Sequence, residues 1–337
     1  MVNSGLDISE PMVFGIGSGI AFYYVFFARG PSGMPLLALR NPPGSLFDTS
    51  AKLLKVDITR RQYKTADLAI EHANRLIDAR VPVAATVDMF YMKYLPSFIQ
   101  VHAPFHFILL VGRDGDYYSV SDPYFGDIGQ LHVEDLRAAW ETHAPMAKDN
   151  RLFYLDGRPP TRDHLKSAVK RGIERTCRKM LMPRALNRVL SFVGIEGMRT
   201  FAKKMRLWPS LYQGVRLREG ILFTAVVFEE QGTGGGAFRL LYGSFLQEVS
   251  DLFQSSEMSD LAGRIIEHGN NWKNASRKLI RVGKPLPMDD DVYPDWYREN
   301  ASALEAGLRE VSEEFLLFAD VEAAFFRDLR AAASRLS

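Results

Sequence analysis

The sequence predicts an α+β domain followed by a mostly α-helical domain. Residues 65–155 alternate helix-type and strand-type patterns of apolar side chains over short segments, which is typical of an α+β domain. Longer amphipathic stretches dominate after residue 161 and favour helices. Gly157-Arg158-Pro159-Pro160 interrupts both patterns, so we place the two domains at residues 1–157 and 161–337.

The elements of the first domain can be predicted in order. Apolar residues at helical spacing predict a helix over residues 65–80, and the apolar run that follows predicts a buried strand over 81–87. Arg113-Asp114-Gly115-Asp116 lies between two strand-type runs and predicts a hairpin. We expect a further strand, a helix and a last strand at residues 130–133, 135–141 and 151–155.

The composition is that of a globular protein, with 337 residues, 47% hydrophobic and 24% charged. The single cysteine, Cys177, excludes a disulfide framework and suits a reducing compartment, so we expect a cytoplasmic location. An uncharged apolar run at residues 12–28 approaches the length of a membrane span. Its glycines, its aromatic cluster and the acidic Asp7 and Glu10 before it favour a buried core. We therefore expect no targeting segment and no membrane contact.

The hairpin carries the most informative pair of side chains. His106 opens its first strand and Asp122 ends its second, so a hairpin centred on Asp114 would place them directly opposite each other. Directly paired residues share a face, with Cβ atoms about 5 Å apart. A carboxylate beside an imidazole fixes its tautomer and stabilises the imidazolium, as in a nucleophilic triad. A polar contact that ends the hairpin is the structural alternative, because a one-residue slip would separate the two faces.

A second interpretation of this segment is a metal site. His102 lies four residues before His106, and with Asp122 the two histidines would make the ligand set of a non-haem iron site. Pro104 argues against a helix that would bring both histidines to one face. Metal binding is therefore the minority interpretation, and we expect no bound metal.

A glycine-rich loop, Gly232 to Gly236, precedes a predicted helix. Backbone N–H groups in such a loop, with an arginine in the first helical turn, can hold an anion, whereas close helix packing is the alternative. The loop matches neither a Walker A motif nor a Rossmann fingerprint, so we expect no cofactor. The candidate substrate-binding residues are Gly234, Gly235, Gly236, Arg239 and His102.

Charge is unevenly distributed along the second domain. Residues 161–206 contain thirteen Lys and Arg against three acidic residues, whereas residues 289–337 contain twelve acidic residues against five arginines. A basic face of this kind suits an acidic partner. The positive residues lack the interleaved aromatics of a nucleic-acid-binding protein, so we expect no nucleic acid. Helices are predicted at residues 165–182, 238–253 and 301–336, the last broken once and apolar enough to support a homodimer.

Three segments together resemble a known family, butirosin biosynthesis protein H and its relatives. Residues 6–19, LDISEPMVFGIGSG, look like that family's SE-x-M-x-FG-x-G-x-G segment. The segment from His102 to Asp122 is similar to its HF-x-x-H…D pattern, and residues 232–239 resemble its GTGGG-x-FR signature. The resemblance implies a papain-like or C39-peptidase-like first domain followed by a helical domain.

The resemblance also implies an activity. The member that names the family forms an amide from an acyl group on a carrier-protein thioester and an amine. On that pattern His106 would be the base and Asp122 its orienting partner, and the acyl carrier protein and an amine acceptor would be the partners. The basic segment at residues 161–206 would suit docking of the acidic carrier.

The chain departs from the family pattern in one respect. Relatives carry a cysteine in a helix upstream of the SE segment, whereas this sequence begins at Met1, shortly before Ser9-Glu10. Three explanations remain: a helix encoded upstream of the assigned start, a non-catalytic relative that binds a carrier protein, an acyl chain or a partner enzyme, or transfer without a covalent intermediate. Cys177 lies in a basic helical segment and is not expected to act as the nucleophile.

Overall fold

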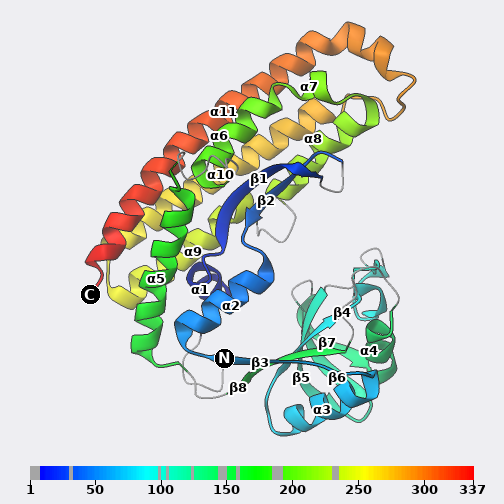
Figure 1. The fold of residues 1–337 in the computed structure, drawn as a ribbon, viewed down its shortest axis with the longest axis vertical. Coiled ribbons are helices and arrows are strands. Elements are labelled where there is room, and N and C mark those ends of the chain that lie inside the picture. The colour runs from blue at the N-terminus through cyan, green and yellow to red at the C-terminus, as the bar shows by residue number, and fades with distance from the viewer. Residues whose placement is uncertain are drawn as a thin grey trace. The chain divides into compact units, whose positions relative to one another are not determined.

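The computed structural model describes residues 8–29, 33–97, 100–103, 106–122, 125–142, 150–156, 160–183, 193–229 and 235–337. Contacts divide the chain into two compact units (Figure 1). The sheet unit is Val56–Arg158, and the helical unit is Met1–Lys55 together with Pro159–Ser337. The chain is α+β, with a sheet-rich region followed by a mostly helical region, as predicted.

The division differs from the predicted boundaries near the start of the chain. Residues 8–55 lie in the helical unit, because α1 (Glu10–Ile16) and β1 (Ile20–Arg29) pack on helices that come more than a hundred residues later in the sequence. The approach is close: a Cβ on Gly15 would stand 2.2 Å from the ring of Phe245. Contacts between residues far apart in sequence, which no local pattern reveals, therefore join this segment to the helices.

The sheet unit is built on six strands in the order β3-β8-β4-β5-β6-β7, and each neighbouring pair is antiparallel. Two helices, α3 and α4, bury their apolar side chains in one core with residues of the strands. The elements are β3 (Asp57–Gln62), α3 (Ala66–Asp78), β4 (Val83–Val87), η2 (Met89–Tyr91), β5 (His106–Asp114), β6 (Tyr117–Asp122), β7 (Phe125–His132), α4 (Val133–Trp140) and β8 (Arg151–Asp156).

Local patterns predicted most of these elements. The helix expected over residues 65–80 is α3, which begins after Thr65, whose Oγ1 accepts a hydrogen bond from Leu68 N–H (3.4 Å). The expected strand at residues 81–87 is β4, and the expected hairpin is β5 with β6. These predictions are confirmed, although β7 is longer than the strand expected at residues 130–133.

The helical unit contains an aromatic core. Trp272, Phe315 and Phe228 have ring centroids 5.0–5.2 Å apart in this core. In chain order its elements are α1, β1, β2 (Pro35–Arg40), α2 (Pro43–Leu54), α5 (Arg162–Met180), α6 (Gly194–Met205), α7 (Trp208–Leu211), α8 (Gly214–Glu229), η4 (Gly236–Phe238), α9 (Arg239–Phe253), α10 (Ser256–Gly283) and α11 (Tyr293–Arg335).

The last helix is longer than predicted and unbroken. α11 runs for 43 residues, drawn from orange to red in Figure 1, so the expected break is absent. Its buried residues keep helical spacing at Leu304, Leu308 and Val311, and they continue to Phe315 and beyond. With no proline after its first turn, α11 keeps its apolar face on the core along its length.

The apolar run at residues 12–28 forms part of α1 and β1. Ile16, Ile20 and Phe22 in this run are fully buried, as expected of a core segment. Among the residues that the structure describes, no helix has both the length and the apolar character needed to cross a lipid bilayer.

Candidate active site

His106 and Asp122 meet at one end of the β5–β6 hairpin. Nε2 of the imidazole lies 2.7 Å from Oδ2 of the carboxylate. The imidazole is 7% exposed and the carboxylate is fully buried. The carboxylate is therefore in position to fix the tautomer of His106, with Nε2 as the protonated nitrogen.

The register of the hairpin differs from the predicted one. Leu109 pairs with Ser121, so the ladder continues with Ile108, not His106, opposite Asp122. The prediction of direct opposition is wrong by two residues, and His106 lies diagonal to the carboxylate. Because side chains alternate with a period of two, a shift of two residues keeps both groups on one face.

A β-bulge at Val111 sets this register. Asp114 pairs with Tyr117 beside the turn, and the ladder shifts at Val111 before it reaches His106 and Asp122. Without the extra residue, the pairing found beside the turn would continue and put His106 and Asp122 on opposite faces. The bulge therefore decides that imidazole and carboxylate meet, and no turn or strand signal predicts it.

Tyr94 is a member of this site that sequence analysis missed. Its hydroxyl donates a hydrogen bond to Oδ2 of Asp122 at 2.6 Å. Burial and the neighbouring carboxylate hold the pKa of Tyr94 well above its ordinary value, so the hydroxyl remains a donor. Gly129 leaves room for the ring, because a Cβ there would stand 2.8 Å from it. Tyr94 has no motif, and only the tertiary fold brings it to Asp122.

His102 contacts a different carboxylate. Its Nδ1 lies 2.8 Å from Oδ2 of Asp88, the residue that follows β4, and its imidazole is 57% exposed. In the described part of the chain, no group of three or more His, Cys, Asp and Glu side chains could hold a metal ion. The ligand set considered for His102, His106 and Asp122 is therefore not assembled.

The glycine-rich loop serves packing where it is described; Gly234 lies outside the described residues. Gly235 and Gly236 have φ values of +84° and +60°, and the next two residues stay in the left-handed region. A Cβ on Gly236 would stand 2.7 Å from the carbonyl oxygen of Gly269 in α10. The glycines thus permit a left-handed turn and a close approach to α10.

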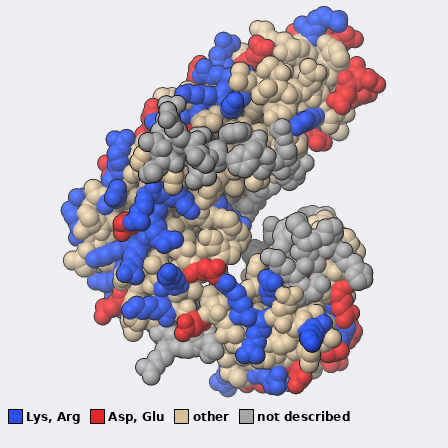
Figure 2. All heavy atoms as spheres, viewed as in Figure 1, with Lys and Arg blue, Asp and Glu red and all other residues tan. Residues whose placement is uncertain are grey.

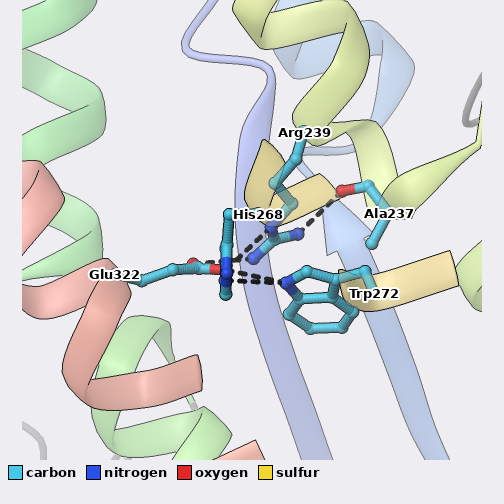
Figure 3. Close-up of polar contacts among 5 residues, drawn as sticks. All are labelled: Ala237, Arg239, His268, Trp272 and Glu322. Atoms are coloured by element: carbon cyan, nitrogen blue, oxygen red, sulfur yellow. Dashed lines mark hydrogen bonds and ion pairs between the residues drawn. The ribbon is translucent and has the colours of Figure 1, made fainter. Parts of the chain in front are cut away.

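Arg239 lies in the core of the helical unit and does not face an anion at the surface (Figure 3). Its guanidinium donates to both carboxylate oxygens of Glu322, at 2.9 and 2.8 Å, and to the carbonyl of Ala237 at 2.7 Å. His268 and Trp272 approach the same carboxylate, at 3.1 and 3.0 Å. The expectation that Arg239 binds substrate is corrected, because its guanidinium is occupied by a buried carboxylate.

Glu322 remains ionised although it is completely buried. Burial raises the pKa of its carboxyl, but the charge of Arg239 and the hydrogen bonds from His268 and Arg239 outweigh burial and lower the pKa to about 2. The guanidinium also stacks on Trp272, with its Cζ 4.1 Å from the ring centroid. His268 is therefore part of a buried network.

Cys177 is unsuited to act as a nucleophile. It is fully buried in α5, and burial raises the pKa of its thiol to about 12. The thiolate is the reactive form of cysteine, and a thiol with so high a pKa is inert at neutral pH. This agrees with the expectation that Cys177 does not replace the cysteine of the family pattern.

Two protein families match the chain. Residues 1–123 match the family described as butirosin biosynthesis protein H, N-terminal. Residues 134–329 match a domain of unknown function, DUF4872. A comparison with curated proteins gave no match.

Proposed function

We propose, from the premise that the chain belongs to the butirosin biosynthesis protein H-like family, that it forms an amide from an acyl thioester and an amine. The family name indicates a role in biosynthesis. The observation that carries the finer proposal is the 2.7 Å contact between Nε2 of His106 and Oδ2 of Asp122. Because Asp122 holds Nε2, the nitrogen that exchanges a proton with the reactants is Nδ1.

In the proposed reaction the amine nitrogen attacks the thioester carbonyl directly. His106 accepts the proton that nitrogen loses as the C–N bond forms, and delivers it to sulfur as the C–S bond breaks. The products are an amide and a thiol. A thioester is already activated, so positioning of the reactants together with about 10²–10⁴-fold from general-base catalysis can support turnover without a covalent intermediate.

Asp122 and Tyr94 support the base in this mechanism. Between the two proton transfers His106 is an imidazolium, which the buried carboxylate stabilises at 2.7 Å. Tyr94 donates to the same oxygen at 2.6 Å and holds the carboxylate in place. Asp122 is thus the orienting residue, and Tyr94 is a positioning residue that acts through it.

An acidic carrier protein is the donor that the charge of the helical unit favours. Lys and Arg side chains gather over α5 in Figure 2. Arg171 and Arg175 are exposed there and form no ion pair with the described residues, whereas Arg178 pairs with Glu174 at 2.6 Å. Unpaired positive charge attracts an acidic surface and raises the rate of encounter.

Mass spectrometry after incubation with acyl thioesters and amines tests the reaction. We expect amide product without an acyl adduct on the protein, and a loss of about 10²–10⁴-fold in rate for His106→Ala. His132→Ala is the matched control, because this histidine of the same unit accepts from Glu134 N–H and serves as a helix cap. A stable adduct on Cys177, or full activity of His106→Ala, would contradict the mechanism.

Charge reversal on α5 tests the carrier. Arg171→Glu combined with Arg175→Glu should raise KM for a carrier-bound donor and leave KM for a small free thioester unchanged. Arg309→Glu, an exposed reversal on the acidic helix α11, is the control. An unchanged KM for the carrier-bound donor in the double variant would remove α5 from the proposal.

A non-catalytic binding role is the second candidate. It is favoured by one observation: the single cysteine of the sequence is fully buried. In that role the protein would hold a carrier protein, an acyl chain or a partner enzyme. Neither amide nor adduct across a broad panel of thioesters, together with saturable binding of an acylated carrier protein, would favour this role over acyl transfer.

A further inference from the structure

The sheet unit contains a second histidine–carboxylate pair, Asp88 with His102. Asp88 is fully buried, and its Oδ2 lies 2.8 Å from Nδ1 of His102. The imidazole is 57% exposed and stacks on Phe90, with ring centroids 4.3 Å apart and planes 16° apart. A buried carboxylate and a flat aromatic ring thus hold an imidazole whose other side reaches solvent.

Asp88 is held as an anion that receives four hydrogen bonds. Oδ1 accepts from the backbone N–H groups of Ala103 at 2.9 Å and Phe90 at 3.3 Å, and Oδ2 accepts from Thr142 at 2.9 Å and from His102. Burial raises the pKa of Asp88, but these hydrogen bonds outweigh burial and lower it. Because the carboxylate only accepts, Nδ1 of His102 carries the proton and Nε2 presents a lone pair to solvent.

The second pair adjoins the first. Val87 in β4 pairs with His106 in β5. Asp88 is the residue directly after Val87, so it lies one position from the partner of His106. The carbonyl of Ala103 accepts from the N–H groups of His106 at 3.3 Å and Met89 at 3.2 Å. The amide N–H of Ala103 donates to Asp88. Backbone hydrogen bonds of Ala103 therefore link the two histidine–carboxylate pairs at one end of β4 and β5.

We infer that Asp88 and His102 form a second proton-transfer site, at which Nε2 of His102 takes a proton from the ammonium form of the amine substrate. This inference rests on the proposed function. An alkyl amine, with a pKa near that of lysine at about 10.4, is almost entirely protonated at neutral pH and has no lone pair to attack a thioester. The proton moves from ammonium to His102 and then to bulk water, and the neutral amine attacks with His106 as base.

Other groups around His102 suit this role. Tyr91 packs edge-on against the ring, with centroids 6.3 Å apart, and Lys93 sits over Phe90 with its Nζ 5.0 Å from the centroid. Asp88 is the acidic group in hydrogen-bond contact with the imidazole, and Lys93 is the nearby cationic group. Asp88 and the two aromatic rings hold the imidazole in one orientation.

The test compares two nucleophiles in one thioester assay. An alkyl amine needs deprotonation at neutral pH, whereas hydroxylamine is weakly basic and already neutral. We expect His102→Gln to lower the alkyl-amine rate at least tenfold more than the hydroxylamine rate at pH 7. The difference between the two rate losses should shrink as pH rises toward the pKa of the alkyl amine, because free amine then forms without a protein base. Thr142→Val removes a hydrogen bond to Asp88. It should also lower the alkyl-amine rate more than the hydroxylamine rate, but by a smaller factor than His102→Gln.

The outcomes separate this inference from the proposed function. Equal loss with both nucleophiles, or no loss with the alkyl amine, overturns the role of His102 and leaves His106 as proposed. Failure of the unaltered protein to acylate even hydroxylamine overturns both. Nitrogen NMR gives a readout without turnover: a neutral His102 with its proton on Nε2 would overturn the inference. His132→Gln is the control and should retain both rates.

Discussion

Each unit of this protein holds a histidine against a buried carboxylate, and the pairs His268–Glu322 and His106–Asp122 differ in the charge that surrounds the carboxylate. In the helical unit, Glu322 receives a bidentate guanidinium from Arg239 as well as His268. In the sheet unit, His106 and Tyr94 contact Asp122 at 2.7 and 2.6 Å. The comparison teaches that a guanidinium which already neutralises Glu322 makes the contact of His268 with that carboxylate structural.

Electrostatics explains the contrast. Arg239 already places a positive charge against the carboxylate of Glu322 in a fully buried cluster, so His268 contacts an anion that is neutralised. His106 contacts the carboxylate of Asp122 directly, with Nε2 2.7 Å from Oδ2. His268 and Glu322 therefore suit a fixed core, and His106 and Asp122 suit the proposed proton transfer.

The largest effect should come from removing the charge of Glu322. Glu322→Gln leaves the guanidinium of Arg239 buried without a counter-charge, so we expect a loss of about 3–5 kcal/mol in the free energy of unfolding. Urea denaturation measures it. An unchanged urea midpoint would mean that the charge of Glu322 is not needed to stabilise the buried guanidinium of Arg239.

The corresponding change in the sheet unit should spare stability and remove activity. In Asp122→Asn the amide nitrogen can face Nε2 of His106, which moves the imidazole proton to Nδ1 and removes the base. We expect amide formation to fall by about 10²–10⁴-fold in the thioester assay. Activity near that of the unaltered protein would show that the tautomer of His106 is unimportant.

Acid should weaken the helical unit through Glu322. The carboxyl has a pKa of about 2 in the folded chain against an ordinary value of 4.5, so its contribution is present in full above pH 4.5. The contribution is lost as pH falls toward 2. The stability of Glu322→Gln, measured by denaturant titration at several pH values, should vary less with pH over this range. Parallel pH curves for the two proteins would contradict the assignment.

The left-handed turn before α9 should show a smaller effect. Gly236→Ala puts a Cβ at a φ of +60° and 2.7 Å from the Gly269 carbonyl oxygen, so we expect a loss of about 1–3 kcal/mol. Gly263→Ala is the matched control, because its Cβ would meet nothing within 4 Å in α10. That exposed helical site should instead gain about 0.5–1 kcal/mol. Equal changes in the free energy of unfolding for the two alanine variants would show that backbone geometry does not set the cost of substitution at Gly236.

The smallest effect is expected at Glu310, an exposed glutamate on the same long helix as Glu322. Lys278 contacts Glu310 at 2.8 Å, with the glutamate 66% exposed. Solvent screens this pair, so Glu310→Gln should leave the urea midpoint unchanged within error. A large shift would show that exposure, rather than burial, governs ion pairs in this unit.

Local patterns predicted much of the sheet unit because its elements are short and their signals are strong. Thr65 marks the start of α3, and the turn at Asp114 marks the hairpin that carries His106 and Asp122. Tyr94 could not be predicted, since a loop tyrosine has no periodicity. The same holds for Glu322, which lies 83 residues from Arg239 and meets it only through helix packing.

The sequence by itself determined the fold class, the hairpin and the residue types that the proposed proton transfer needs, because these follow from turn chemistry and side-chain periodicity. The tertiary structure decided that Val111 forms a bulge and so puts His106 and Asp122 on one face. It also decided that Arg239 faces a buried glutamate rather than an anion at the surface. Register and burial depend on contacts across strands and helices, and such contacts have no period along the chain.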